Sequence, residues 1–301
     1  MNHFLKLLDY STEELTHLLD LADQLKYEVK HGIPHPLLKG KTLGLIFQKS
    51  STRTRVSFEV GMVQLGGYPL FLSANDLQIG RGEETKDTAR VLSRYLDGIM
   101  IRTFDQAEVN ELAEYGSIPI INGLTDSWHP CQILADLMTI REYKQSLEGL
   151  KLCYIGDGNN VASSLVVGCL KTGMSITVVS PSGYGPNQEA LDFAKAYGDK
   201  FQLLSDVKEG VKDADVIYTD VWTSMGQEAE SAKRKEAFAG YMVSKELVSL
   251  AKDDVIVLHC LPAHKNEEIS EEVFEAHANE IFDQAENRMH AQKAILVTLM
   301  K

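Results

Sequence analysis

A regular alternation of short apolar stretches with segments of helical periodicity constrains the fold of this chain most strongly. In the first half the expected strands are Thr42–Gln48, Tyr68–Leu72, Gly98–Arg102 and Pro119–Asn122. In the second half they are Lys151–Ile155, Ser175–Ser180, Val216–Thr219 and Val255–His259. Strands joined through helices run parallel, and helices then cover both faces of the sheet. We therefore expect an α/β fold of two domains, each a parallel sheet flanked by helices.

Helical signals set the expected domain limits. Ser11 with Glu14 three residues later forms a capping box, which begins a first amphipathic helix. The apolar positions in Ile133–Met138 predict a long helix that leads into the second half, and Ala291–Met300 predicts a helix that returns to the first. We expect one domain over 1–140, with 286–301 packing back on it, and a second over 141–285, joined by these interdomain helices.

Composition excludes several classes of protein. The chain has 301 residues, of which 44% are hydrophobic and 24% charged, as in globular proteins. A net charge of −13 argues against a nucleic-acid partner held through phosphates. No apolar stretch is long enough for a membrane span, and the first residues lack a signal-peptide core. The four cysteines are far apart and form no disulfide or zinc pattern, so we expect a cytoplasmic protein.

Ser51-Thr52-Arg53-Thr54-Arg55 stands where an expected strand gives way to a helix. The first N–H groups of a helix lack helical partners and lie at the positive end of its dipole. Hydroxyls on both sides of one arginine, with a second arginine after them, would make this end a site for a doubly charged oxyanion. The alternative is a helix cap followed by two solvated arginines.

Other polar residues follow the ends of expected strands, where ligands gather in sheets of this kind. They are Arg102, His129 with Gln132 at the start of a helix, Asp220 before Ser224-Met225-Gly226, and Cys260-Leu261-Pro262. Taken singly, the histidine is more often a cap or packing residue and the cysteine more often an inert part of the core. Their joint position favours a functional site.

Two rival sites have weaker support. Gly156-Asp157-Gly158 follows a strand, but the third position of a dinucleotide fingerprint is Val161 and no acidic residue ends the next strand. His259, Cys260 and His264 do not have the spacing of a usual zinc site. The acidic interval 267–280 is most simply a solvated helical face.

Three motifs, in this order and spacing, resemble the carbamoyltransferase family: Ser51–Arg55, His129-Pro130-Cys131-Gln132 and His259-Cys260-Leu261-Pro262. Asp220–Gly226 is similar to the branch of that family that uses ornithine. The aspartate branch shares the first two motifs but lacks the Ser-Met-Gly loop and the cysteine. The resemblance extends over nearly the whole chain.

The resemblance implies transfer of the carbamoyl group of carbamoyl phosphate to the δ-amine of L-ornithine, giving L-citrulline and phosphate, without a metal or an organic cofactor. It implies three catalytic side chains, those of Arg102, His129 and Cys260. The carbamoyl phosphate ligands would be Ser51, Thr52, Arg53, Thr54, Gln78, Arg102, His129, Gln132, Cys260, Leu261 and Arg288. The L-ornithine ligands would be Asn160, Asp220, Ser224 and Met225.

The resemblance also implies how the parts act. Donors from Arg102, His129 and Thr54 would stabilise charge on the carbamoyl oxygen, Asp220 would bind the α-ammonium group, and domain closure would exclude water. Gln78 matches a residue that the family donates to a neighbouring subunit, which implies a homotrimer with shared active sites. The lack of long terminal extensions favours the biosynthetic direction. An anion-binding α/β protein without turnover stays open, because fold alone does not fix function.

Overall fold

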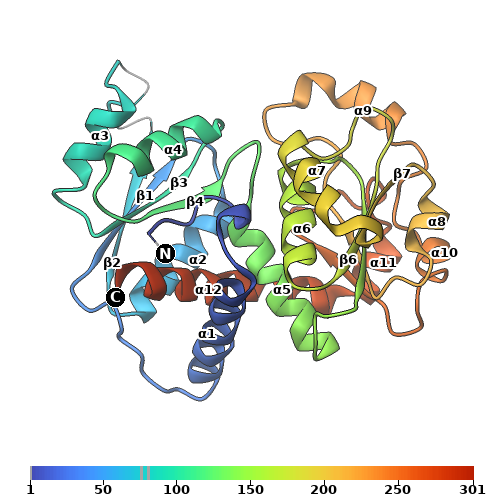
Figure 1. The fold of residues 1–301 in the computed structure, drawn as a ribbon, viewed down its shortest axis with the longest axis horizontal. Coiled ribbons are helices and arrows are strands. Elements are labelled where there is room, and N and C mark those ends of the chain that lie inside the picture. The colour runs from blue at the N-terminus through green and yellow to red at the C-terminus, as the bar shows by residue number, and fades with distance from the viewer. Residues whose placement is uncertain (1, 75–76, 80–81) are drawn as a thin grey trace. The chain divides into compact units, whose positions relative to one another are not determined.

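The computed structural model describes residues 2–74, 77–79 and 82–301, and they form two compact units (Figure 1). Unit 1 comprises Met1–Ala135 and Asn287–Lys301, and unit 2 comprises Asp136–Glu286. Each unit contains one parallel sheet, of four and five strands, flanked by helices. The predicted α/β fold class is therefore confirmed. None of the helices in these described ranges has the length and apolar character needed to span a membrane.

Unit 1 contains a sheet of order β2-β1-β3-β4. Its strands are β1 (Thr42–Phe47), β2 (Tyr68–Ser73), β3 (Gly98–Arg102) and β4 (Ile120–Leu124). Its helices are α1 (Thr12–Lys30), α2 (Thr52–Gln64), α3 (Thr85–Leu92) and α4 (Gln106–Tyr115), with a short 3₁₀ turn at Leu7–Asp9. The two divisions between units fall within α5 (Pro130–Lys144) and α12 (Ala278–Met300).

The local signals of unit 1 act as expected. Ser11 Oγ accepts the N–H of Glu14 at 3.2 Å, and the Glu14 carboxylate accepts the N–H of Ser11 at 2.9 Å, which completes the predicted capping box of α1. One face of the sheet packs with α3 and α4 into a core that includes Ile99, Ile101 and Leu112. In Figure 1, α2 lies on the other side of this sheet from α3 and α4.

Unit 2 contains a sheet of order β7-β6-β5-β8-β9. Its strands are β5 (Lys151–Ile155), β6 (Ser175–Val179), β7 (Phe201–Leu204), β8 (Val216–Thr219) and β9 (Ile256–His259). Its helices are α6 (Asn160–Lys171), α7 (Gln188–Ala194), α8 (Val207–Val211), α9 (Ser231–Ala237), α10 (Lys245–Val248) and α11 (Glu271–Ala276), with 3₁₀ turns at Lys195–Lys200 and Glu228–Glu230.

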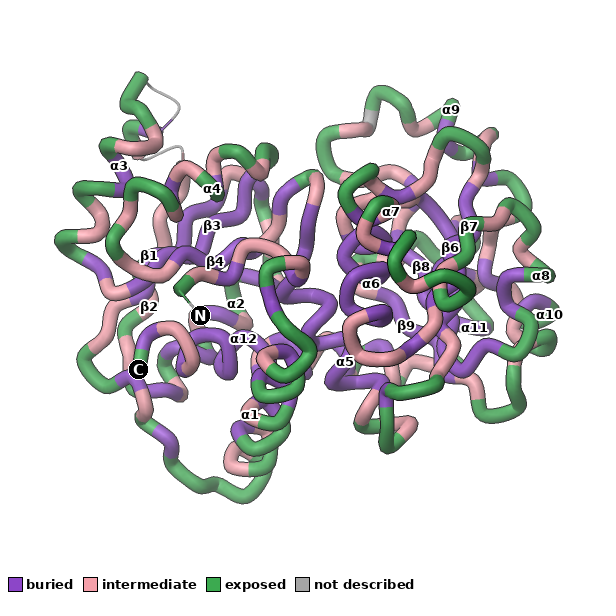
Figure 2. The backbone as a smooth tube through the Cα atoms, viewed as in Figure 1, coloured by how far each residue is buried: buried purple, intermediate pink, exposed green. Residues whose placement is uncertain are grey.

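Strand β7 is absent from the sequence-based prediction. It lies at the edge of the sheet, and its four residues are exposed or half-buried, so it lacks the apolar run that marks the central strands. The central strands β5 and β8 are almost wholly buried, and Figure 2 shows β8 in the purple of buried residues.

The strand orders place the ligand-binding positions. In each sheet the order reverses between two central strands, β1 and β3 in unit 1, and β5 and β8 in unit 2. Ligands of parallel sheets bind beyond the carboxyl ends of the strands at such a point. The Ser51 loop follows β1 and Arg102 is the last residue of β3, whereas the 156–160 turn and Asp220 follow β5 and β8.

Candidate active site

The Ser51 motif forms the N-terminus of α2. Ser51 is the N-cap, and its hydroxyl accepts the N–H of Thr54 at 3.2 Å. The cap reading of this motif is therefore correct for Ser51. Thr52 is exposed, Arg53 is half-buried, and Thr54 is buried. The buried threonine does not follow from a simple cap, because its hydroxyl takes part in a second set of contacts.

That set is centred on Arg288 of α12, which is buried in unit 1. Its Nη2 donates to Thr54 Oγ1 at 2.8 Å, and its Nη1 donates to Gln132 Oε1. The same Nη1 lies 3.4 Å from His129 Nε2. Residues distant in sequence, from α2, the start of α5 and α12, are thus gathered around one guanidinium.

His129 is held neutral in this cluster. Burial, followed by the positive charges of Arg288 and Arg102, lowers the pKa of His129 well below its usual value. A guanidinium can only donate, so the His129 Nε2 that faces Arg288 must accept, and the ring proton lies on Nδ1. Arg102 is itself buried at the end of β3. Two buried arginines and a neutral imidazole form a strongly anion-attracting site.

Arg55, the second arginine of the motif, makes its contacts along α2 and with β2. Its Nε donates to Glu59 at 2.9 Å, one turn along α2, and its guanidinium stacks on the Phe71 ring at 3.6 Å. It lines a cavity of about 370 Å³ beyond β1 and β2. The lining residues are Phe47, Gln48, Ser50, Ser51, Thr52, Arg55, Val56, Phe71 and Ser73. Gln78 is exposed in the segment between β2 and α3.

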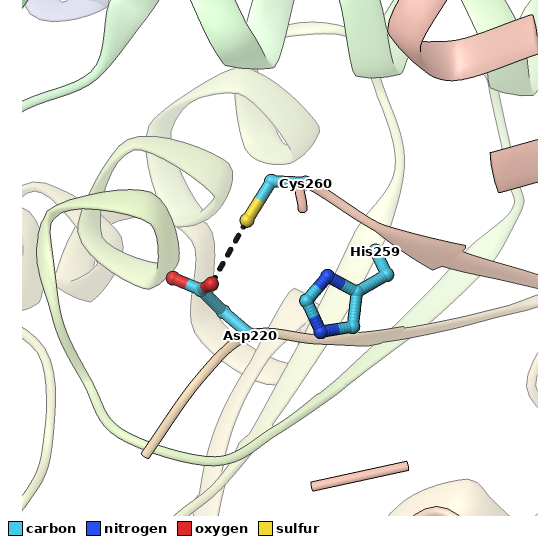
Figure 3. Close-up of side chains that lie close together, drawn as sticks. All are labelled: Asp220, His259 and Cys260. Carbon is cyan, nitrogen blue, oxygen red and sulfur yellow. Dashed lines mark hydrogen bonds between the residues drawn. The ribbon is translucent and has the colours of Figure 1, made fainter. Parts of the chain in front are cut away.

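Unit 2 carries a second cluster around Asp220, which is buried just after β8. Its carboxylate accepts the Cys260 thiol at 3.0 Å, the Asn159 side-chain amide at 2.7 Å and the N–H of Val221 at 2.8 Å. Figure 3 shows the Cys260 thiol directed at Asp220, with the His259 ring beside this pair. Burial, then the Asp220 charge, raises the pKa of Cys260 well above its usual value, so the thiol stays protonated.

The His259 ring is fully occupied by protein contacts. Its Nδ1 accepts the N–H of Leu261 at 2.9 Å, so its Nε2 carries the proton and donates to the buried Glu268 at 3.0 Å. These bonds hold Leu261, whose φ of 59° is unusual for an L-residue, and the cis peptide bond to Pro262. Because Glu268 is fully buried, the expectation of a solvated helical face over 267–280 is wrong for this residue.

The same contacts weigh against a metal site. Ligand atoms of Asp220, His259 and Cys260 lie within 4.8 Å of one another, but a cation there would displace an existing bond of His259. His264, the other histidine considered for a metal, has a side chain that is 55% exposed.

The Ser-Met-Gly loop is tied at its base. Arg234 Nη1 donates to the Trp222 carbonyl at 3.0 Å and to the Asp157 carboxylate at 2.8 Å. The N–H of Ser224 donates to Gln227 Oε1 at 3.2 Å, while Met225 is 50% exposed. The base of the loop is thus fixed and the methionine side chain is available to a ligand.

The turn after β5 also argues against a dinucleotide. The N–H of Gly158 donates to the Tyr184 carbonyl at 2.7 Å, so it is not directed at a phosphate. A Cβ on Gly158 would lie 2.1 Å from the backbone of Gly185, which closes the space beside this turn. Asn159 caps α6 through its side-chain oxygen, and Asn160 is the first helical residue.

The structure thus brings Thr54, His129, Gln132 and Arg288 together in unit 1, and Asp220 and Cys260 together in unit 2. Sequence reasoning missed Asn159 and Arg234. Asparagine at a helix start is a signal for a cap, and that signal could have found Asn159. Arg234 gave no signal, because it stands between Lys233 and Lys235 and resembles a solvated run of charges.

Comparisons with known proteins agree with this arrangement. Residues 2–142 match the model of the aspartate/ornithine carbamoyltransferase carbamoyl-P binding domain, and residues 148–299 match that of the Asp/Orn binding domain. The chain is 57% identical to an ornithine carbamoyltransferase of Oceanobacillus iheyensis over 301 residues, which are 99% of this chain and 94% of that protein.

Solved structures agree as well. The ornithine carbamoyltransferase of Pyrococcus furiosus is 51% identical with a TM-score of 0.95, covering 99% of this chain and 97% of that one. The anabolic enzyme of Campylobacter jejuni is 43% identical with a TM-score of 0.94, covering 99% of both chains. Two family models that together span nearly the whole chain, and relatives of this identity, lead to one conclusion: the chain belongs to the aspartate/ornithine carbamoyltransferase family.

Proposed function

We propose that this protein is an ornithine carbamoyltransferase, which makes L-citrulline and phosphate from carbamoyl phosphate and L-ornithine. The observation that carries the proposal is the buried Arg288, bonded to Thr54 and Gln132 in unit 1. Relatives that share up to 57% of its residues carry the same name, which supports ornithine as the acceptor.

Unit 1 binds carbamoyl phosphate in this proposal. The phosphate dianion takes the free N–H groups and hydroxyls at the N-terminus of α2, where Ser51, Thr52 and Arg53 stand. Arg102 and Arg288 supply positive charge from buried positions. Gln132 holds the carbamoyl amide group, and the carbamoyl oxygen lies among Thr54, Arg102 and His129, which stabilise its growing negative charge.

Unit 2 binds L-ornithine. The Asp220 carboxylate, held by the Asn159 amide and the Val221 N–H, receives the α-ammonium group. Asn160, Ser224 and Met225 complete the contacts to the amino acid. Cys260, protonated and hydrogen-bonded to Asp220, lies beside the δ-amine, with the Leu261 carbonyl as a further acceptor.

The chemistry is a direct acyl transfer. The neutral δ-nitrogen forms a bond to the carbamoyl carbon, and the bond from that carbon to the phosphate oxygen breaks with its electron pair leaving on phosphate. The nitrogen gives up one proton, which the departing phosphate takes. Orientation of the two substrates and a preorganised set of donors account for such a reaction.

We further propose a homotrimer that shares its active sites. Val56, Val60 and Val63 form one exposed face of α2, and Tyr68 is exposed on β2, the edge strand of the sheet. Exposed apolar patches of this kind mark protein interfaces. The cavity beside Ser51 and Thr52 would receive the Gln78 segment of the neighbouring copy.

The direction is proposed to be biosynthetic, and the relative from Campylobacter jejuni, described as anabolic, supports this. The four cysteines are free thiols, which suits a reducing compartment such as the cytoplasm.

A citrulline assay tests the proposed function. The protein is incubated with carbamoyl phosphate and, in separate reactions, L-ornithine, L-aspartate, putrescine or N-acetyl-L-ornithine, and the carbamoylated product is measured. Of the four acceptors, only L-ornithine is expected to be carbamoylated. Preference for another acceptor would change the assignment of unit 2, and phosphate binding without turnover would contradict the enzymatic function.

A further inference from the structure

A cluster of buried polar residues in unit 2 contacts the residue that precedes Cys260 and takes no part in the reaction proposed above. It joins Asp136 of α5, Tyr218 of β8 and Gln284 of α12, and each is at most 1% exposed. Tyr218 Oη donates to Asp136 Oδ2 at 3.0 Å. Gln284 Nε2 donates to Asp136 Oδ1 at 2.7 Å and lies 3.0 Å from Tyr218 Oη.

The cluster reaches the backbone next to Cys260. Gln284 Oε1 accepts the N–H of His259 at 3.0 Å. Because a backbone N–H must donate and a carboxylate accepts, only one orientation of the Gln284 amide satisfies both neighbours. Asp136 and Tyr218 therefore fix the amide, and the amide fixes the residue that precedes Cys260.

The cluster also acts on the Cys260 thiol through the charge of Asp136. After burial and the Asp220 charge, the negative charge of Asp136 also raises the pKa of Cys260. The hydroxyl of Tyr218 donates its single proton to the Asp136 carboxylate and so offsets part of that charge. Tyr218 is paired with Leu258 in the neighbouring strand β9, two residues before Cys260 in the chain.

We propose that Asp136, Tyr218 and Gln284 are positioning residues, which hold the Cys260 thiol against Asp220 and so shape the ornithine-binding end of unit 2. The inference rests on the proposed function for its kinetic consequence. The placement of the Cys260 thiol does not depend on the proposed function, because all four residues involved lie in unit 2. Buried networks of this kind are rigid only when every donor and acceptor is satisfied, so loss of one hydroxyl should be felt at Cys260.

The experiment uses Tyr218→Phe in the full-length protein. The matched control is Tyr241→Phe, which likewise removes one hydrogen-bonded tyrosine hydroxyl of unit 2. The Tyr241 hydroxyl donates to the Ser205 carbonyl at 3.0 Å and makes no hydrogen bond to the cluster. The first readout is the pH dependence of alkylation by iodoacetamide. Cys131, Cys153 and Cys169 are buried, so the native protein reacts at Cys260, and Cys260→Ala confirms the assignment.

In Tyr218→Phe the alkylation profile should move to higher pH by about half a unit or more, because the Asp136 carboxylate loses the donor that offsets its charge near Cys260. The KM for L-ornithine should rise about tenfold, while that for carbamoyl phosphate stays within about twofold. Tyr241→Phe should change neither. An unchanged profile and an unchanged ornithine KM in folded Tyr218→Phe would overturn the proposal, as would equal changes in both variants.

A second variant covers the case in which Tyr218→Phe does not fold. Gln284→Met keeps the volume of the side chain but removes the acceptor of the His259 N–H, and it should also raise the KM for L-ornithine selectively. A parallel loss for both substrates would contradict the proposal. The alkylation measurement needs no turnover, so it still decides the placement of the thiol if the wild-type protein makes no citrulline and the proposed function fails.

Discussion

The Arg234 guanidinium joins two segments of unit 2 through one nitrogen, which lies 2.8 Å from the Asp157 carboxylate and 3.0 Å from the Trp222 carbonyl. Both partners are buried. Burial raises the pKa of Asp157 to about 6, although Arg234 opposes this rise. The contact sets the distance between the 157–160 turn and the loop after Asp220, which are the two segments proposed to bind L-ornithine.

Arg234→Gln should therefore impair ornithine binding without affecting carbamoyl phosphate. Glutamine can still donate to Trp222, but it loses the charge that holds Asp157. We expect the KM for L-ornithine to rise about tenfold and the KM for carbamoyl phosphate to stay within about twofold in steady-state assays. Lys233→Gln, next to it on the surface, is the control. Equal increases for both substrates would mean that Arg234 supports the fold in general.

Arg288→Lys should weaken carbamoyl phosphate binding, although it keeps the charge. Lysine has one nitrogen at its end and cannot donate to Thr54 and Gln132 in the forked geometry of a guanidinium. We expect the KM for carbamoyl phosphate to rise by about a hundredfold, or about 2.7 kcal/mol. Arg90→Lys, on the exposed surface of α3, should behave as wild type. A lysine variant with normal affinity would remove Arg288 from the anion site.

Lys293 gives unit 1 a pH-dependent stability. Its ammonium is buried, donates to Gln64 at 2.9 Å and lies 3.1 Å from His35 Nε2, and burial lowers its pKa from 10.5 to about 8. The folded state therefore binds fewer protons than the unfolded chain between pH 8 and 10.5. The contribution of Lys293 to the free energy of unfolding is lowest below pH 8, where its buried side chain is charged. This contribution rises as the pH increases from 8 to 10.5.

Urea unfolding of wild type and Lys293→Met at several pH values measures this effect. The free energy of unfolding of wild type, minus that of Lys293→Met, should increase by about 2 kcal/mol between pH 7 and 9.5. Subtraction removes the other titrating groups, and Lys39→Met, at an exposed lysine, is the control. A difference that does not vary with pH would show that Lys293 titrates alike in both states.

Much of this arrangement could be predicted from sequence, and the reasons are local. The central strands are continuous apolar runs, and the Ser11 capping box is a short pattern, so both follow from neighbouring residues. Edge strand β7 has no such run. Glu268 and Arg234 are charged residues within charged segments, and only tertiary packing decides that they are buried. The roles of Arg288 and Cys260 came from the family resemblance. Arg288 contacts Gln132, 156 positions away, and Cys260 contacts Asp220, 40 positions away, and contacts so distant in sequence leave no periodic signal.

The valine face of α2 predicts how the proposed trimer can be disrupted. Val60 and Val63 are 40% and 62% exposed, one turn apart, so a glutamate at either costs little in an isolated subunit but places a charge within an apolar interface. Val63→Glu should lower the mass measured by sedimentation equilibrium from that of a trimer towards that of a monomer, with loss of activity. Val91→Glu, an equivalent change on the exposed face of α3, should leave both unchanged.

Subunit mixing decides whether the active sites are shared. Gln78→Ala and Arg288→Lys should each have low activity as pure proteins, because every site then lacks one contributor. If Gln78 of one subunit serves the site of its neighbour, a mixed trimer contains some sites with an intact Gln78 and an intact Arg288. Unfolding the two variants together and refolding them should then restore a part of the wild-type rate, about a quarter or less for random mixing. Refolding each variant alone is the control, and activity in the mixture no higher than the mean of the two would place Gln78 outside the neighbour's site.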